Sequence, residues 1–276
     1  MKRLFLFIVA LAVSNSVFAY QVHTVEVASK VMPKGVMVNV ILPDSYEVTE
    51  AFPVVYLLHG YADNQDAWLN KGQAAELADQ HNVIIVMPDG GFNSWYFDSP
   101  LNKNSMRESF IIKELIPYID KRYKTIADRT ARAITGLSMG GHGALYLAIR
   151  HQDIFAFAGS MSGGVDITPF PNNWEISSHL GTQEENPEVW AQHTVINLVD
   201  QIKPESLSLV FDCGVDDFFY EVNCNLHEKL LSLKIPHDYC VRPGAHTWEY
   251  WRNSVKYHFL YFSLGFQSAA NNIESK

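Results

Sequence analysis

The stretch ITGLSMGGHG, residues 134–143, decides the fold. It contains Gly-x-Ser-x-Gly around Ser138, the sequence of a nucleophile elbow, in which a strand turns sharply into a helix and presents a serine hydroxyl. The serine backbone is strained there and side chains two residues away would collide, which explains Gly136 and Gly140. An apolar strand over 130–135 and a small-residue helix from Ala144 give the motif its required context, whereas an ordinary glycine-rich turn is the alternative.

Apolar runs alternate with helical patterns along most of the chain, which is typical of a parallel sheet with helices on both faces. Two alternating segments, 22–28 and 35–42, predict an antiparallel opening hairpin. Further strands are predicted over residues 53–58, 83–87, 130–135, 155–163, 207–214 and 237–242. Helices are predicted over 66–80, 105–123 with a Ser105/Glu108 capping box, 220–233 and 247–264, followed by a polar tail.

One doubly wound, mostly parallel α/β domain over 20–276 accounts for this pattern, since no repeat or linker divides it. Residues 164–203, after the sixth strand, break the alternation with several prolines and polar residues. Trp174 and Trp190 lie within this segment, which we interpret as a cap-like insertion of short helices and loops.

Residues 1–19 have the pattern of a secretory signal peptide. Lys2 and Arg3 precede an apolar run over 4–13, and Val17-Phe18-Ala19 resembles a cleavage site. The run is short for a bilayer span, so an uncleaved anchor is the weaker alternative. We therefore expect an exported protein, periplasmic or secreted, without a stable membrane anchor.

Composition narrows the classes of partner. Hydrophobic residues make up 47% of the chain, enough for a large core, and the net charge of −9 disfavours nucleic acid and anionic membranes. A small-molecule or carbohydrate substrate fits better, and the oligomeric state is left open. Three cysteines are too few for a disulfide framework; Cys213 and Cys240 form the candidate pair, with unpaired thiols as the alternative.

A nucleophilic serine needs a histidine base and a carboxylate that orients the histidine. In the order serine, acid, histidine, Asp217 follows the strand over 207–214 and His246 follows the strand over 237–242. Asp216 is the neighbouring alternative for the acid, and His246 could instead be a packed histidine beside Trp248. Three residues in this order, each after its own strand, predict a catalytic triad.

Acyl transfer also needs donors for the developing oxyanion. The backbone N–H of Met139, directly after the serine, is the first expected donor. The second should come from the loop after the strand over 53–58, where Tyr61 is preferred to Gly60.

Four segments together resemble a known family. They are residues 57–61 (LLHGY), 94–96 (SWY), 136–141 (GLSMGG) and 244–251 (GAHTWEYW). The chain resembles, over about residues 22–265, the Putative esterase family of α/β-hydrolases, which includes esterase D or S-formylglutathione hydrolases, feruloyl and acetyl-xylan esterases and mycolyltransferases. The resemblance implies the α/β-hydrolase fold and a serine esterase that needs no cofactor, with Ser138, Asp217 and His246 as its triad.

Several residues near strand ends are candidates for substrate contact, with core packing as the alternative: His59, Trp68, Trp95, Tyr96 and, from the insertion, Trp174. His142 is interpreted as a packed histidine rather than a base. The histidines show no metal-ligand spacing, so no metal is expected.

These features favour hydrolysis of carboxylic esters through an acyl-Ser138 intermediate, on short-chain acyl or feruloyl esters of sugars. The alternatives are acyl transfer to a sugar hydroxyl, an S-formylglutathione-type thioesterase, and a noncatalytic binding domain.

Overall fold

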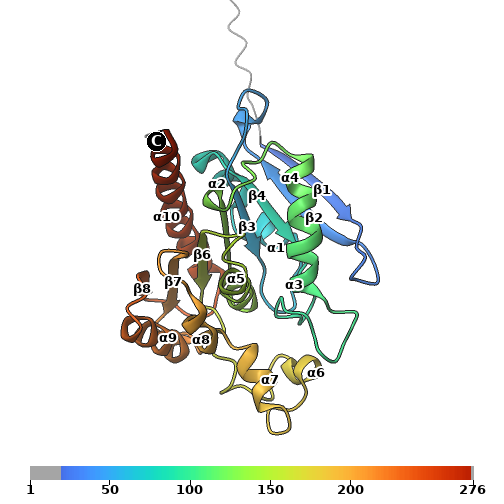
Figure 1. The fold of residues 1–276 in the computed structure, drawn as a ribbon, viewed down its shortest axis with the longest axis vertical. Helices are drawn as coiled ribbons and strands as arrows, with labels where there is room; N and C mark the ends of the chain where they lie inside the picture. Colours follow the sequence, from blue (N-terminus) through green and yellow to red (C-terminus); the bar gives the residue numbers. More distant parts are fainter. Residues whose placement is uncertain (1–19, 275–276) are drawn as a thin grey trace, which may run out of the picture.

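An eight-stranded sheet with helices on both faces organises the molecule (Figure 1). The computed structural model describes residues 20–274, so the predicted signal peptide lies outside the described residues. The strands are β1 Gln21–Val27, β2 Val36–Leu42, β3 Val54–Leu58, β4 Ile84–Pro88, β5 Arg132–Gly136, β6 Phe157–Met161, β7 Ser208–Gly214 and β8 His237–Arg242. The α-helices are α1 Ala67–Lys71, α2 Ala74–His81, α3 Arg107–Phe110, α4 Ile116–Arg122, α5 Met139–Arg150, α6 Ile176–Leu180, α7 Pro187–Gln192, α8 Val195–Leu198, α9 Tyr220–Ser232 and α10 Trp248–Glu274.

The strand order is β1-β2-β4-β3-β5-β6-β7-β8. Strands β1 and β2 form the predicted antiparallel hairpin, and β2 also pairs antiparallel with β4. All later neighbours are parallel, as β3 is with β5 and β7 is with β8. Because parallel strands end at one edge of the sheet, the loops after β3, β5, β7 and β8 meet there.

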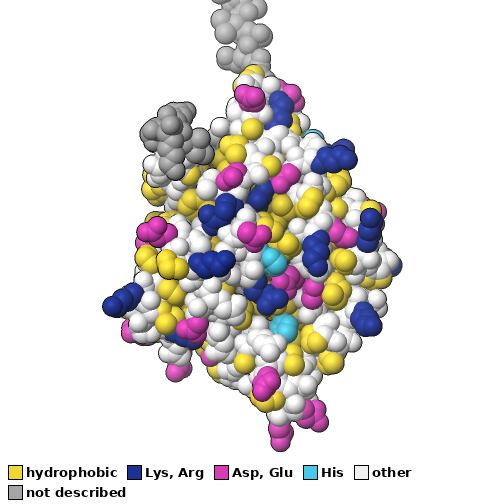
Figure 2. Space-filling view, viewed as in Figure 1, with side chains coloured by type: hydrophobic (Ala, Val, Ile, Leu, Met, Phe, Trp, Pro, Cys, Tyr) yellow, Lys and Arg dark blue, Asp and Glu magenta, His cyan; other side chains and the backbone are white. Residues whose placement is uncertain are grey.

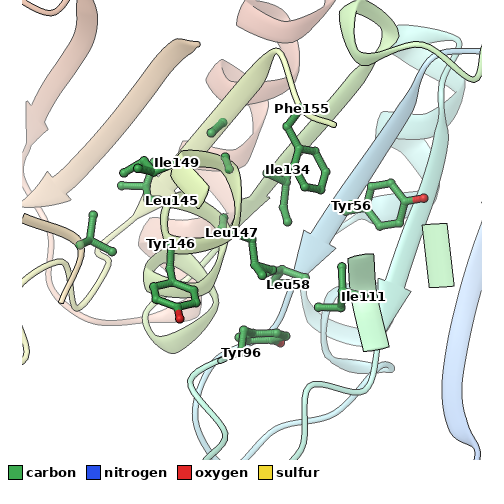
Figure 3. Packing of buried hydrophobic residues seen from close by; sticks show 14 of the residues in the cluster. Tyr56, Leu58, Tyr96, Ile111, Ile134, Leu145, Tyr146, Leu147, Ile149 and Phe155 are labelled. Carbon is green, nitrogen blue, oxygen red and sulfur yellow. The ribbon is translucent and has the colours of Figure 1, made fainter. Parts of the chain in front are cut away.

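The core consists of two layers because successive side chains of a strand point to opposite faces. Val54, Tyr56 and Leu58 of β3 pack on one face with α4, α5 and α9, and Figure 3 shows this layer around Tyr56, Leu58 and Leu147. Val55 and Leu57 pack on the other face with α1, α2 and α10. All five β3 side chains are buried, and each large apolar one contributes about 2 kcal/mol to stability.

The prediction of one continuous helix over residues 66–80 is wrong. The helix is interrupted between α1 and α2, where Gln73 has a φ of 57°. A Cβ on the intervening Gly72 would lie 2.2 Å from the Trp68 ring, so the chain turns closely around this indole.

The helix predicted over residues 105–123 is not a regular α-helix along its whole length. Residues 111–115 form a wide π turn between α3 and α4. The turn ends two residues before Pro117, which has no N–H for a regular helical hydrogen bond. The predicted capping box is wrong because the Glu108 carboxylate turns inward. It accepts hydrogen bonds from Arg150 Nε at 2.8 Å and from His151 Nε2 at 2.7 Å.

Two further expectations concern the C-terminal half. Helix α10 continues to Glu274, well beyond residue 264, and so includes most of the predicted polar tail. All three cysteines are free, so the candidate Cys213–Cys240 bridge is wrong. Cys240 lies opposite Asp212 and Cys213 opposite Val241, which directs the two thiols to opposite faces of the sheet.

The 164–203 segment contains α6, α7 and α8 joined by loops, as predicted, and projects beyond the carboxyl edge of the sheet (Figure 1). Within residues 20–274, none of the helices combines the length and the apolar character that a membrane crossing requires.

The Glu108 cluster predicts a pH-dependent contribution to stability. Burial would raise the pKa of Glu108, but hydrogen bonds from His151 and Arg150 outweigh burial and lower the pKa to about 2. The ionised carboxylate is therefore stabilising above its unfolded pKa of about 4.5, and this stability is lost as pH falls toward 2. We expect Glu108→Gln to cost about 2 kcal/mol or more in urea unfolding at pH 7, and about 1 kcal/mol less at pH 3.5. An equal cost at both pH values would contradict this account.

Candidate active site

Ser138 lies at a strained turn between β5 and α5. Its backbone has φ 54° and ψ −117°, a region that a non-glycine residue adopts only when the surrounding structure enforces it. The Ser138 N–H donates to Met161 O at 2.9 Å, and the His142 N–H donates to Ser138 O at 3.0 Å. The turn is therefore fixed by β6 on one side and by the first turn of α5 on the other.

The two motif glycines allow backbones to approach closely. A Cβ on Gly140 would lie 2.5 Å from His59 O and 2.6 Å from Leu58 O. A Cβ on Gly136 would lie 2.6 Å from the Gly140 backbone. A side chain at either position would push α5 away from β3, which is the steric reason for the motif.

Ser138, His246 and Asp217 form a continuous hydrogen-bonded chain. Ser138 Oγ lies 2.8 Å from His246 Nε2, and His246 Nδ1 lies 3.0 and 2.9 Å from the two carboxylate oxygens of Asp217. This places the Nδ1 proton toward the carboxylate and leaves Nε2 to accept from the serine. The structure thus brings together the three residues that the sequence predicts as a triad.

The loops that carry the acid and the histidine are tied to each other. The N–H groups of Val215 and Asp216 donate to Arg242 O at 3.0 Å and Gly244 O at 2.9 Å. A Cβ on Gly214 would lie 2.2 Å from Gly244 O, so this contact also depends on a missing side chain. The Asp217 carboxylate accepts from Phe219 N at 2.8 Å as well as from His246.

Asp216 and Asp217 have different surroundings. Asp216 is exposed, whereas Asp217 is 5% exposed and directs its carboxylate at the histidine. Of the two acids left open by the sequence, Asp217 has the geometry of a triad carboxylate.

The two predicted oxyanion donors belong to residues near Ser138. Met139 follows the serine at the start of α5, and Tyr61 lines the same cavity as the serine. In residues 20–274, neither backbone N–H has a hydrogen-bond acceptor. Two free donors beside a nucleophile are the arrangement that stabilises a tetrahedral oxyanion.

Three predicted substrate-contact residues hold the loop before Tyr61 instead. Trp68 Nε1 donates to Leu58 O at 2.9 Å, and Tyr96 Oη donates to His59 O at 3.1 Å. His59 Nδ1 lies 2.7 Å from Gly60 O, while its Nε2 accepts from Gly90 N at 2.8 Å, which fixes the proton on Nδ1. All three side chains are buried and none lines the cavity. Their hydrogen bonds hold the backbone carbonyls of residues 58, 59 and 60 in place.

An aromatic cavity of about 240 Å³ opens beside the serine. Of the predicted contact residues only Trp174 lines it. The full lining consists of Gly60, Tyr61, Asp63, Leu137, Ser138, Trp174, Phe218, His246, Trp248 and Trp251. The sequence did not single out Phe218, although its place directly after Asp217 was a usable signal.

Phe218 packs on the His246 ring. Its ring centroid lies 4.2 Å from that of His246 and 5.7 Å from that of Trp174. Trp251 contacts His246 edge-on at 4.8 Å. These rings hold the imidazole in place and line the route by which an acyl group would reach Ser138.

Three further aromatic residues lie behind the cavity. Trp95 and Trp190 are buried, and Trp190 Nε1 donates to Gly181 O, so Trp190 anchors the insertion rather than covering the site. Burial lowers the pKa of His142 to about 4, so this histidine is neutral and packed beneath Trp95. Within the described residues, no group of three His, Cys, Asp or Glu side chains is placed to hold a metal ion.

A family model described as Putative esterase matches residues 29–261. The chain belongs to the Putative esterase family. An esterase of Mycobacterium tuberculosis is 32% identical over 242 residues, which cover 76% of this chain and 52% of that protein. An acetyl esterase of Caldicellulosiruptor saccharolyticus is 27% identical over 236 residues, 78% of this chain and 85% of the relative.

A solved structure of a ferulic acid esterase superimposes with a TM-score of 0.78 and 31% identity, covering 90% of this chain and 99% of that one. This similarity confirms the α/β-hydrolase fold predicted from the sequence. The chain spans about half the length of the mycobacterial esterase.

The geometry predicts that the two adjacent aspartates respond differently to substitution. Asp217→Asn removes the charge that orients His246 and should lower kcat by about 10⁴-fold, as in other triads. Asp216→Asn is the matched control, and its kcat should stay within about threefold of the kcat of the unchanged protein. Kinetics on p-nitrophenyl acetate checks both; a larger loss in Asp216→Asn would transfer the role to Asp216.

Proposed function

We propose that this protein hydrolyses carboxylic esters through an acyl-Ser138 intermediate, and that its substrates are short-chain acyl or feruloyl esters of sugars. The observation that carries the proposal is the 2.8 Å contact between Ser138 Oγ and His246 Nε2, beside a cavity that also contains Tyr61. Relatives named acetyl esterase and ferulic acid esterase support the substrate class.

In the first half-reaction, Ser138 Oγ attacks the ester carbonyl carbon as His246 Nε2 takes the hydroxyl proton. The carbonyl oxygen becomes an oxyanion held by the N–H groups of Met139 and Tyr61, and each such donor lowers the barrier by about 3 kcal/mol. The carbon–oxygen bond to the alcohol then breaks, His246 returns the proton to the leaving alkoxide, and the acyl group stays on Ser138.

In the second half-reaction, water takes the place of the alcohol. His246 accepts a proton from water, the resulting hydroxide attacks the acyl carbon, and the second tetrahedral intermediate uses the same two donors. Collapse of this intermediate releases the carboxylic acid and returns the proton to Ser138 Oγ. Asp217 keeps its charge throughout and stabilises the imidazolium form of His246.

The cavity lining supports a planar or small acyl group. Trp174, Phe218, Trp248 and Trp251 line the same cavity as Ser138, and Asp63 is the one carboxylate in its described lining. A volume of about 240 Å³ accommodates an acetyl or cinnamoyl-type group.

Removing the nucleophile tests the mechanism. Ser138→Ala deletes the attacking oxygen and should lower kcat on p-nitrophenyl acetate by about 10⁶-fold, by analogy with other serine hydrolases. Mass spectrometry after rapid acid quench should show an acylated serine in the unchanged protein and none in the variant. Hydrolysis by Ser138→Ala at an unchanged rate would overturn the acyl-serine mechanism, provided that circular dichroism shows an intact fold.

Shortening the aromatic wall tests the substrate class. Trp174→Ala should lower kcat/KM for methyl ferulate by about tenfold or more, because a ring that stacks on the aryl group is lost. The same variant should keep kcat/KM for methyl acetate within about threefold, since this ester has no ring to stack on the Trp174 indole. Equal losses on both substrates would argue against an aryl-binding role for Trp174.

A further inference from the structure

Strand β8 forms one edge of the sheet. It pairs with β7 on its inner side, and no other described strand lies beside it (Figure 1). The Val215 N–H donates to Arg242 O, so residue 242 directs its backbone polar groups inward, toward β7 and the loop after it. Successive residues alternate in direction, and therefore residues 239 and 241 direct their N–H and C=O groups outward. An exposed edge of this kind can accept another strand.

Apolar side chains border this edge. Val241 is 41% exposed, and Tyr257, Leu260 and Leu264 of α10 are 48%, 51% and 58% exposed. The three α10 residues are spaced by three and four, so they form one stripe along the helix. They line a groove of about 200 Å³ together with Asp238, Cys240 and Arg242 of β8. Figure 2 shows hydrophobic side chains gathered at the left margin of the molecule, in the region of β8.

The sequence of β8 is complementary to itself in one antiparallel register. If Cys240 lies on a twofold axis, Asp238 lies opposite Arg242 of a second copy, and Tyr239 lies opposite Val241. Tyr239 and Val241 have the outward backbone groups, so these two pairs become the hydrogen-bonded pairs of the ladder. The Cys240 pair and both Asp238–Arg242 pairs become the closely spaced non-hydrogen-bonded pairs, where side chains approach most.

We propose that this protein forms a twofold homodimer by antiparallel pairing of β8, which joins the two sheets into one. A second copy is selected as the occupant because Asp238 of one copy lies opposite Arg242 of the other at both ends of the pairing, and because the apolar stripe of α10 then lies beside its own symmetry mate. Arg242 already holds Asp212 through Nη1 at 3.1 Å, so its remaining N–H groups are the ones that would meet Asp238 of the second copy. Four main-chain hydrogen bonds form between Tyr239 and Val241 across the axis. The axis reverses strand direction, so the two catalytic edges face opposite ways and both cavities stay open.

The oligomeric state tests the proposal independently of esterase activity. Sedimentation equilibrium of the unchanged protein from about 1 to 100 µM should show a dimer. Leu260→Lys places a charge in the centre of the stripe and should raise the dimer dissociation constant by about tenfold or more. Val48→Lys is the matched control at a residue 83% exposed elsewhere, and it should leave the dissociation constant unchanged. A monomer at 100 µM, or a dimer insensitive to Leu260→Lys, would overturn the proposal.

Cross-linking tests the register. Diamide oxidises two Cys240 thiols to one disulfide; each thiol loses a hydrogen, an S–S bond forms, and both hydrogens with their electrons reduce the N=N bond to a hydrazine. We expect a linked dimer from the unchanged protein and none from Cys240→Ser, which keeps the partly exposed Cys224. Adding Val241→Cys to Cys240→Ser moves the thiols off the axis and should restore less than a fifth of the cross-link. Equal cross-linking by Cys240→Ser would overturn the register.

Discussion

The close approach of two backbone segments is the constraint on which the site depends. The carbonyls of Leu58 and His59, at the end of β3, lie against the first turn of α5 at Gly140. This contact fixes the distance between the serine elbow and the loop that carries Tyr61. Trp68, Tyr96 and His59 then saturate the carbonyls of residues 58–60, so the loop cannot rotate its amides toward the protein interior. The resulting donors are preorganised, which makes them effective for a charge that develops only during reaction.

A second contact of the same kind positions the acid and the base. The loops after β7 and β8 touch at Gly214 and Gly244, and main-chain hydrogen bonds join them. Asp217 and His246 are therefore held as one unit, which the rings of Phe218 and Trp251 pack against. Ser138 belongs to the unit formed by the end of β3 and the start of α5, and its 2.8 Å hydrogen bond to His246 connects the two units. The parallel sheet places both units at one edge, so four loops distant in sequence make one site.

The positions of Ser138, Asp217 and His246 after successive strands could be predicted from the sequence because local signals mark each position. Gly-x-Ser-x-Gly, Asp217 and His246 each follow a segment that the sequence predicts as a strand. Side-chain contacts were harder to predict where tertiary interactions compete with local sequence motifs. Glu108 matches a capping box, but its carboxylate turns inward to bind Arg150 and His151. The sequence could not show which aromatic residues line the cavity. In the structure, the buried Trp68 indole donates to a backbone carbonyl, whereas Trp174 lines the cavity.

The insertion between β6 and β7 takes part in the cavity wall and also contacts the turn that carries Ser138. It contributes Trp174 to the cavity wall, while the nucleophile, acid, base and oxyanion loop all come from other parts of the chain. Trp190 holds the insertion together by donating to Gly181 O, and at the start of the insertion the Gly164 N–H donates to Ser138 O at 3.4 Å. Changes in residues 164–203 can therefore alter both what the cavity accepts and how firmly the His246 ring is held, because Trp174 reaches His246 through Phe218.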